Sequence, residues 1–315
     1  MHARLLQDLS LLTSETLCNS IENPFYTKEY ISYRMLQGYT PYLLGYDINT
    51  DCLAFMKNGR LRCGLEIPSI PDISVDDTFW QQLENFCHQK GVTDLSVNSF
   101  GSPGGIIPLI GREKSRKIRQ EYILKLNHSD FMMKMSKGHA YRIKKARKLG
   151  MLVERRRDQE AITIHASLIS TSMQRRKERG ENVGTIIAVE NLSQLMATGV
   201  AELFCVISVN QIISSCLVLL SKKTGYSHTM GTSPEGMAGG AAHFLIHEIA
   251  SILREEGKDS FNLGGTDDPN PESGLVKFKT GFGLSVKPVE LQSASFRMAS
   301  PISSLARRYL LHLRG

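Results

Sequence analysis

Two kinds of periodicity alternate along the first third of the chain. Aromatic and apolar residues at helical spacing begin at Asn23-Pro24 and end near Gly38, with proline in the first turn, where its missing N–H is not needed. Strand-like runs follow at residues 42–46, 52–56 and 61–67, and Asn58-Gly59 predicts a hairpin between the last two. A helix capped by Asp76-Asp77 and a strand at 95–97 come next. This order predicts the beginning of a layered α/β domain.

The second part of the chain has a similar order of elements. We expect a long helix from Ser129-Asp130 to Gly150, a strand at 152–154, and helices over 159–179 and 189–198. The runs at 201–209, 211–220 and 225–230 predict an antiparallel meander. An amphipathic helix over 241–256 and a buried strand ending at 261–263 follow. The fold class predicted for both parts is α/β (α+β), with a mixed twisted sheet flanked by helices in each.

The stretch from residue 261 to 283 combines a strand end, a polar loop and a short helix. Gly264 and Gly265 are expected to end the strand, because glycine takes positive φ without steric cost. Asp267 and Asp268 begin a loop of turn residues, and the short helix after it carries Lys279. A lysine beside a glycine-opened strand end is suited to a reaction site. The alternative is a solvated surface lysine, which is the usual environment of this residue type.

Positive charge is concentrated in one predicted helix. The formal net charge is +7 and the pI about 9.0. Between Asp130 and Gly150 every charged residue is basic, and Lys134, Lys137, Tyr141, Lys144 and Lys148 share one helix face. A face of one sign predicts a polyanionic partner, such as RNA, the phosphates of coenzyme A or a nucleotide-linked substrate. A solvated helix face is the alternative. The candidate polyanion-binding residues are Lys137, Arg142, Lys144, Lys145 and Lys148.

A glycine-rich segment, residues 233–240, precedes the amphipathic helix. Exposed N–H groups at a helix N-terminus favour an anion, so we expect cofactor or donor phosphates at Gly236, Ala238, Gly239 and Gly240. A plain flexible loop is the alternative. His243 and His247 lie four residues apart on the helix, but their order with Glu248 is not that of zinc proteases, and we predict no metal site.

The segments 225–231, 241–257, 261–265 and 278–283, taken in this order, resemble the FemAB-like transferases of the GNAT superfamily. The similarity covers about residues 122–291, and 142–150 resembles the start of the second FemAB-like domain. It implies a degenerate first GNAT-like domain at 1–125, a second with the transfer site at 126–292, and a segment at 293–315 that packs back on the first. Gly236 and Ala238 match the phosphate loop of GNAT enzymes, but Ser233 stands where Arg or Gln is usual. This departure is shared by FemAB-like proteins that use aminoacyl-tRNA.

The resemblance implies transfer of an acyl or aminoacyl group from acyl-CoA or aminoacyl-tRNA to an amine, with no tightly bound cofactor. Lys279 would stabilise the developing oxyanion, and Asp267 or Asp268 would accept the proton of the amine. Gly264, Gly265 and Phe278 would line the substrate. The acceptor could be a cell-wall or peptide precursor. Three alternatives stay open: a CoA-dependent N-acetyltransferase acting on a small molecule or polysaccharide precursor, an RNA-binding module without catalysis, and a catalytically inactive scaffold.

Composition also predicts the cellular compartment of the protein. The six cysteines contain no Cys-x-x-Cys pair and several lie in apolar runs, which predicts reduced thiols and a cytoplasmic protein. We find no apolar run of membrane-spanning length and no secretory signal pattern near residue 1. The sequence leaves the donor, the acceptor and the oligomeric state open.

Overall fold

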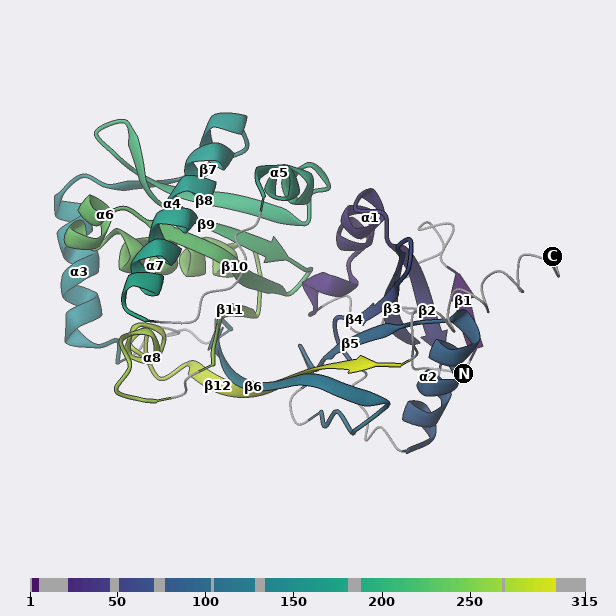
Figure 1. The fold of residues 1–315 in the computed structure, drawn as a ribbon. Coiled ribbons are helices and arrows are strands. Elements are labelled where there is room, and N and C mark those ends of the chain that lie inside the picture. Colours follow the sequence, from purple (N-terminus) through teal and green to yellow (C-terminus); the bar gives the residue numbers. More distant parts are fainter. Residues whose placement is uncertain are drawn as a thin grey trace. The chain divides into compact units, whose positions relative to one another are not determined.

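The computed structural model describes residues 2–5, 22–45, 51–70, 77–102, 105–127, 134–180, 188–267 and 270–298. The chain divides into two compact units, the first formed by Met1–Gln120 with Val289–Gly315 and the second by Glu121–Pro288. Figure 1 shows the elements of both. Among the helices in these ranges, none has the length and apolar character needed to cross a membrane.

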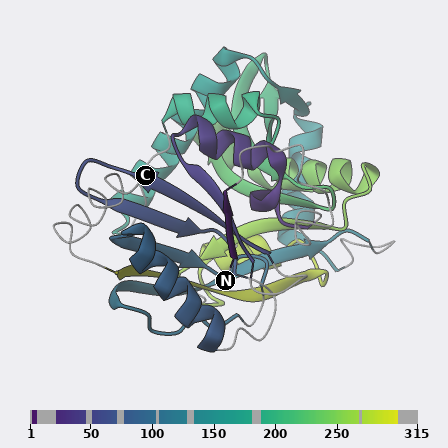
Figure 2. The ribbon, with the colours of Figure 1, turned by 90° about the vertical axis from the view of Figure 1, so that its right-hand side faces the viewer.

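The first unit is a mixed sheet with helices on both faces. Its strand order is β1-β2-β3-β4-β5-β12-β6, with antiparallel pairing along β1 to β4, a parallel β4–β5 pair and an antiparallel β5–β12 pair. The helices α1 and α2 lie on opposite faces of the strands (Figure 2). The bounds are β1 His2–Leu5, η2 Pro24–Tyr26, α1 Lys28–Leu36, β2 Thr40–Gly45, β3 Asp51–Asn58, β4 Cys63–Ile67, α2 Asp77–Lys90, β5 Asp94–Asn98, β6 Arg112–Lys125 and β12 Val286–Arg297.

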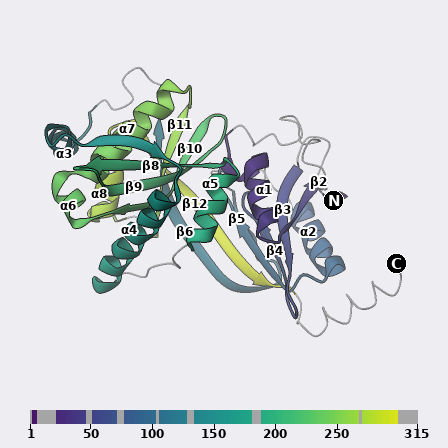
Figure 3. The same ribbon diagram turned by 90° about the horizontal axis from the view of Figure 1, so that it is seen from above.

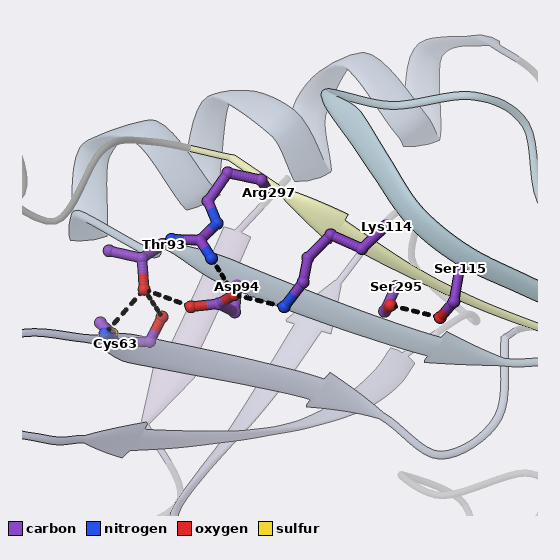
Figure 4. A network of polar contacts seen from close by, with 7 residues as sticks. All are labelled: Cys63, Thr93, Asp94, Lys114, Ser115, Ser295 and Arg297. Atoms are coloured by element: carbon purple, nitrogen blue, oxygen red, sulfur yellow. Dashed lines mark hydrogen bonds and ion pairs between the residues drawn. The ribbon is translucent and has the colours of Figure 1, made fainter.

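An ion network fastens β5 to its neighbours in the first unit (Figure 4). Asp94 accepts hydrogen bonds from Thr93 Oγ1 at 2.8 Å and Lys114 Nζ at 3.1 Å, and Arg297 Nη2 lies 3.5 Å away. Partial burial raises the pKa of Asp94, but the bonds from Thr93 and Lys114 outweigh it, so the pKa is lowered. Charged and polar side chains thus connect the start of β5 to β6 and β12.

The second unit has a mixed sheet in the order β6-β11-β10-β9-β8-β7. Its strands pair antiparallel from β7 to β10, whereas β10 and β11 pair in parallel. The bounds are α3 Lys137–Lys148, β7 Leu152–Arg156, α4 Gln159–Glu178, α5 Val189–Ala197, β8 Ala201–Ser208, β9 Gln211–Leu220, β10 Thr224–Thr232, α6 Pro234–Gly239, α7 Ala241–Glu255, β11 Ser260–Thr266 and α8 Gly274–Thr280. The predicted mixed α/β fold class is confirmed in both units.

Successive side chains of β9 point to opposite faces of the sheet and therefore contact two different layers of the second unit. Ser215 faces α4, where it bonds His165, whereas the next residue, Cys216, belongs to the apolar core under α7. Figure 3 shows α4 and α7 on opposite sides of the strands. The five cysteines within the described residues are buried, and none of them forms a disulfide.

The structure corrects several element predictions. Helix α3 begins at Lys137 behind the N-cap Ser136, so Lys134, which has a φ of 58°, precedes the helix and does not share its face. Strand β11 continues through Gly264 and Gly265 to Thr266 instead of ending at the glycines. The glycine-rich segment contains the short helix α6 where a loop was expected, because Ser233 caps it and Pro234 occupies its first turn. Asp268 and residues 299–315 of the predicted C-terminal segment lie outside the described residues.

Candidate active site

The parallel strands β10 and β11 pair over only three positions. The paired residues are Thr224 with Ser260, Gly225 with Phe261, and Tyr226 with Asn262. Within the described strands the ladder ends there, although β10 continues to Thr232 and β11 to Thr266. The register of β10 against β9 also shifts between Ser227 and Thr229. The backbone groups of β11 beyond Asn262 are thus released from the β10 ladder, and they can bind other groups.

Lys279 lies at this point. It is buried, with 5% of its surface exposed, and its Nζ donates a hydrogen bond of 2.6 Å to the carbonyl of Leu263. The ammonium also lies 5.8 Å from the centroid of the Tyr122 ring. Burial of an ammonium is costly, so its environment must compensate the charge with dipoles and hydrogen bonds. The solvated-lysine alternative therefore fails, and the structure places the predicted lysine inside the domain.

Gly264 makes room for this lysine. Its φ is 77°, a conformation that side chains rarely adopt. A Cβ at Gly264 would lie 3.4 Å from Lys279 Nζ and 3.4 Å from the carbonyl oxygen of Ser227 on β10. The predicted glycine thus lies directly against Lys279 and the last part of β10. Gly265, the second glycine predicted to line the substrate, is half-buried in the same strand.

A histidine that sequence reasoning missed holds α8 in place. The Nε2 of His139 donates to the carbonyl of Phe278 at 2.8 Å, because a carbonyl can only accept. The other nitrogen, Nδ1, then accepts from Ser136 Oγ at 2.7 Å. The ring leaves no room for a side chain at Gly281, whose Cβ would lie 2.1 Å from its Cε1. His139 thereby connects the N-terminus of α3 to the helix that carries Lys279.

Around His139 four rings pack edge to face. The centroid of His139 is 4.5 Å from His243 and 4.8 Å from Phe282, and His243 lies 4.9 Å from Phe278. Burial lowers the pKa of His139, and burial together with His139 and Arg142 lowers the pKa of His243 to about 4. Both rings are therefore neutral near pH 7. Phe278, predicted to line the substrate, belongs to this cluster and is half-buried.

The basic helix α3 packs on α7 through one face and exposes the other. Its buried residues are His139, Ile143 and Ala146, and Arg147 pairs with Glu248 of α7 at 2.8 Å. Lys145 reaches the carbonyl of Ala238 in α6 with a hydrogen bond of 3.0 Å. The five predicted polyanion-binding residues are exposed, namely Lys137, Arg142, Lys144, Lys145 and Lys148. The structure thus brings the basic helix next to the segment predicted to bind phosphates.

The glycines of that segment are required by packing. A Cβ at Gly236 would lie 2.5 Å from the carbonyl of Ile213 on β9, and one at Gly240 would lie 2.6 Å from the carbonyl of Arg142. A Cβ at Gly239 would meet Met151 Cε at 2.4 Å, and Ala238 is exposed. The space that these three glycines leave is occupied by protein, so their presence is no sign of a ligand. Phosphate binding at this junction stays a prediction.

The remaining predicted residues are the aspartates that follow β11 and the histidine pair of α7. Asp267 follows the end of β11 and is exposed. Asp268 lies outside the described ranges. His247 bonds Glu248 through Nδ1 at 3.0 Å, on the surface of α7.

Comparison with known proteins agrees with this architecture. Residues 133–275 match the family model described as acetyltransferase (GNAT) domain. The crystal structure of FemX superposes with a TM-score of 0.65 at 14% identity, over 93% of this chain and 97% of FemX. A conserved protein of unknown function from Bacteroides thetaiotaomicron VPI-5482 superposes with a TM-score of 0.56 at 14% identity, over 93% and 97% of the two chains. Curated protein sequences contain no match.

These findings confirm the resemblance derived from the sequence. The family match begins before α3, includes β7 to β11 and ends at residue 275, before Lys279. The similarity to FemX extends the agreement in fold to both units. Residues 133–275 therefore match the GNAT acetyltransferase domain model, within a chain that has the fold of FemX.

Proposed function

We propose that this protein transfers an acyl or aminoacyl group from an activated donor to an amine, with Lys279 at the centre of the site. One observation carries the proposal: Lys279 is buried and hydrogen-bonded to β11, close to the position where β11 stops pairing with β10. A cation in a partly dry site stabilises negative charge far better than one in water. Family membership supports the reaction class, because the GNAT domain is an acyltransferase domain.

The proposed reaction proceeds through a tetrahedral intermediate. The amine attacks the donor carbonyl carbon, a C–N bond forms, and the carbonyl oxygen takes negative charge that Lys279 Nζ stabilises. Collapse of the intermediate breaks the C–O bond of an aminoacyl ester or the C–S bond of a thioester. The proton of the amine passes to a carboxylate, for which Asp267 and Asp268 at the end of β11 are the proposed groups, and from there to the leaving group. Gly264, Gly265 and Phe278 would line the reacting groups.

The donor is proposed to bind along α3 and the adjoining start of α7. Both donor classes, aminoacyl-tRNA and acyl-CoA, carry phosphates, and the exposed face of α3 presents five basic residues beside α6. Phosphate contacts to lysine and arginine give affinity without sequence recognition, which suits either donor. Lys145 is oriented towards α6 by its bond to Ala238, so the two predicted binding segments act as one surface. The amine acceptor is proposed to be a cell-wall or peptide precursor.

A donor screen tests the proposal. The purified chain would be incubated with labelled acyl-CoA species or charged tRNAs, each with a panel of amine acceptors that includes cell-wall precursors, peptides and amino sugars. Mass spectrometry would detect the new amide. We expect transfer from one donor class only, and mass spectrometry of copurified coenzyme A would separate the two classes. Two results together would establish the non-catalytic RNA-binding alternative instead: no transfer from any donor, and RNA binding that is unaffected by substitution of Lys279.

A further inference from the structure

Glu121 is a buried carboxylate in the middle of the second unit. It belongs to the last part of β6, is 2% exposed, and accepts a hydrogen bond of 2.5 Å from Asn262 Nδ2 on the neighbouring strand β11. Its neighbour Tyr122 faces the apolar core under α7, so Glu121 points to the opposite side of the strand. Burial of a carboxylate is unfavourable, and an apolar residue would serve packing better. A role beyond packing is therefore indicated.

The contact with Glu121 determines the orientation of the Asn262 amide. A carboxylate only accepts hydrogen bonds, so the NH₂ group of Asn262 must face Glu121. The carbonyl end of the same amide, Oδ1, then faces the other way and accepts the backbone N–H of Gly264 at 2.8 Å. Asn262 is also the last residue of β11 that pairs with β10. Its side chain thus continues to hold β11 after the ladder has ended.

The peptide group between Leu263 and Gly264 is held from both sides. Its N–H donates to Asn262, and its C=O accepts from Lys279 Nζ at 2.6 Å. In a trans peptide the N–H and C=O point in opposite directions, so fixing one fixes the other. The torsion directly after this peptide plane is the φ of Gly264, which is 77° and lies in the left-handed region. A continuous chain of hydrogen bonds therefore runs from Glu121 through Asn262 and this peptide to Lys279.

We propose that Glu121 is a positioning residue for Lys279, acting through Asn262 and the Leu263–Gly264 peptide. This inference rests on the proposed function for its catalytic meaning but not for its geometry. Glu121 orients the Asn262 amide, the amide orients the peptide plane, and the peptide carbonyl fixes the ammonium where the donor carbonyl reacts. The carboxylate does not touch the substrate. Without Glu121 the side-chain amide of Asn262 can flip, which exchanges its NH₂ and carbonyl ends. The carbonyl of Leu263 then no longer faces Lys279.

Two substitutions and a matched control test this chain. Glu121→Met removes the acceptor and keeps the volume, whereas Glu121→Gln retains an oxygen that can accept from Asn262 Nδ2. Glu202→Met is the control, because Glu202 is a largely buried carboxylate of β8 in the same unit, paired with Arg155 at 3.1 Å. The readouts are amide hydrogen exchange at Gly264 and the rate at which an amine-reactive acylating reagent labels Lys279, both in the full chain.

We expect Glu121→Met to raise both rates about tenfold, the effect of losing one buried hydrogen bond. Glu121→Gln should stay near wild type, and Glu202→Met should lower the melting temperature without changing either rate. Unchanged rates in Glu121→Met would overturn the proposal and make Glu121 a packing residue only. Turnover is measured separately: normal turnover in a Glu121→Met protein whose two rates have risen would leave the positioning supported and overturn the proposed role of Lys279.

Discussion

Helix α3 and helix α8 present positive charge in opposite ways. On α3, the basic side chains lie on an exposed face and can together attract an approaching anion. On α8, one ammonium is buried and bonded to a single carbonyl, while Lys277 of the same helix is exposed and paired with Glu272 at 2.6 Å. Exposed charges are screened by salt and are individually weak, whereas a buried charge acts strongly over a short distance. The difference supports the proposed division, in which α3 attracts the donor and α8 stabilises the reacting atoms.

The two helices are joined by His139. It belongs to α3, and its ring donates to the carbonyl of Phe278, the residue before Lys279. Binding on α3 and chemistry on α8 thus share one structural connection within the unit. Four predictions separate the contributions of these regions.

The largest effect is expected at Lys279. Lys279→Met keeps the length of the side chain and removes the charge, so turnover should fall about 10²-fold or more, as for other oxyanion donors. Donor affinity should change far less, because α3 is intact. Lys279→Arg should restore only part of the turnover, since the planar guanidinium differs in shape from an ammonium. Steady-state kinetics measure both quantities.

Lys277→Met provides the control on the same helix. Its side chain is exposed and paired with Glu272, so turnover should stay near wild type. Equal losses in the two variants would mean that α8 tolerates no substitution, and near-normal turnover of Lys279→Met would remove Lys279 from the mechanism.

The next largest effect is expected where α3 meets α8. Gly281→Ala places a methyl group 2.1 Å from the His139 ring, so the two helices must separate. We expect the free energy of unfolding to fall by about 1–3 kcal/mol, as in other overpacked sites. Gly274→Ala on the same helix meets no atom within 4 Å and should be neutral or stabilising. Chemical denaturation of both variants measures the difference, and equal stabilities would contradict the contact.

Lowering the pH should destabilise the contact between α3 and α8. Burial lowers the pKa of His139, and that of His243 to about 4, whereas both titrate near 6.5 in an unfolded chain. Below about pH 6.5 the unfolded state therefore binds more protons, so stability falls as the pH is lowered towards 4. His165 and His228, with pKa values lowered to about 3 and about 4 by burial, act in the same direction.

Melting temperatures between pH 7.5 and pH 4.5 measure this dependence. The variant His243→Phe keeps a ring in the cluster and removes one titrating group, so the melting temperature should fall less steeply with acid. A His243→Phe slope equal to that of wild type would show that this ring is protonated equally in both states.

The smallest effect per residue is expected on α3. Charge reversal at Lys137, Lys144 and Lys148 should weaken binding of the donor and lower the slope of log affinity against log salt by about one unit per lost phosphate contact. Turnover at saturating donor should change little. Reversal of Lys177 and Lys222, exposed lysines elsewhere in the unit, is the control. Unchanged affinity and slope in the α3 variant would exclude this face from donor binding.

The sequence by itself determined the order of the elements and their class. Apolar runs at 201–209 and 211–220 were sufficient for the meander, because continuous apolar runs bounded by turn residues are typical of strands buried on both faces. The short helix with Lys279 was predicted from a run of apolar residues and two closing glycines, whereas its N-cap, Ser273, was identified only in the structure. The start of α3 was misplaced because two serines, at 129 and 136, are equally good N-caps by local chemistry.

Tertiary structure decided which of these residues act together. The burial of Lys279 depends on β11 and on β6, the second of which is distant in the sequence, and its helix alone predicts a surface lysine as readily. The packing of Gly236 and Gly281 against Ile213 and His139 has no local signal, because a glycine required by a close neighbour looks the same in sequence as one in a loop. Glu121 was likewise hidden within a basic strand, since only its contact with Asn262, 141 positions along the chain, reveals that a buried charge is held there.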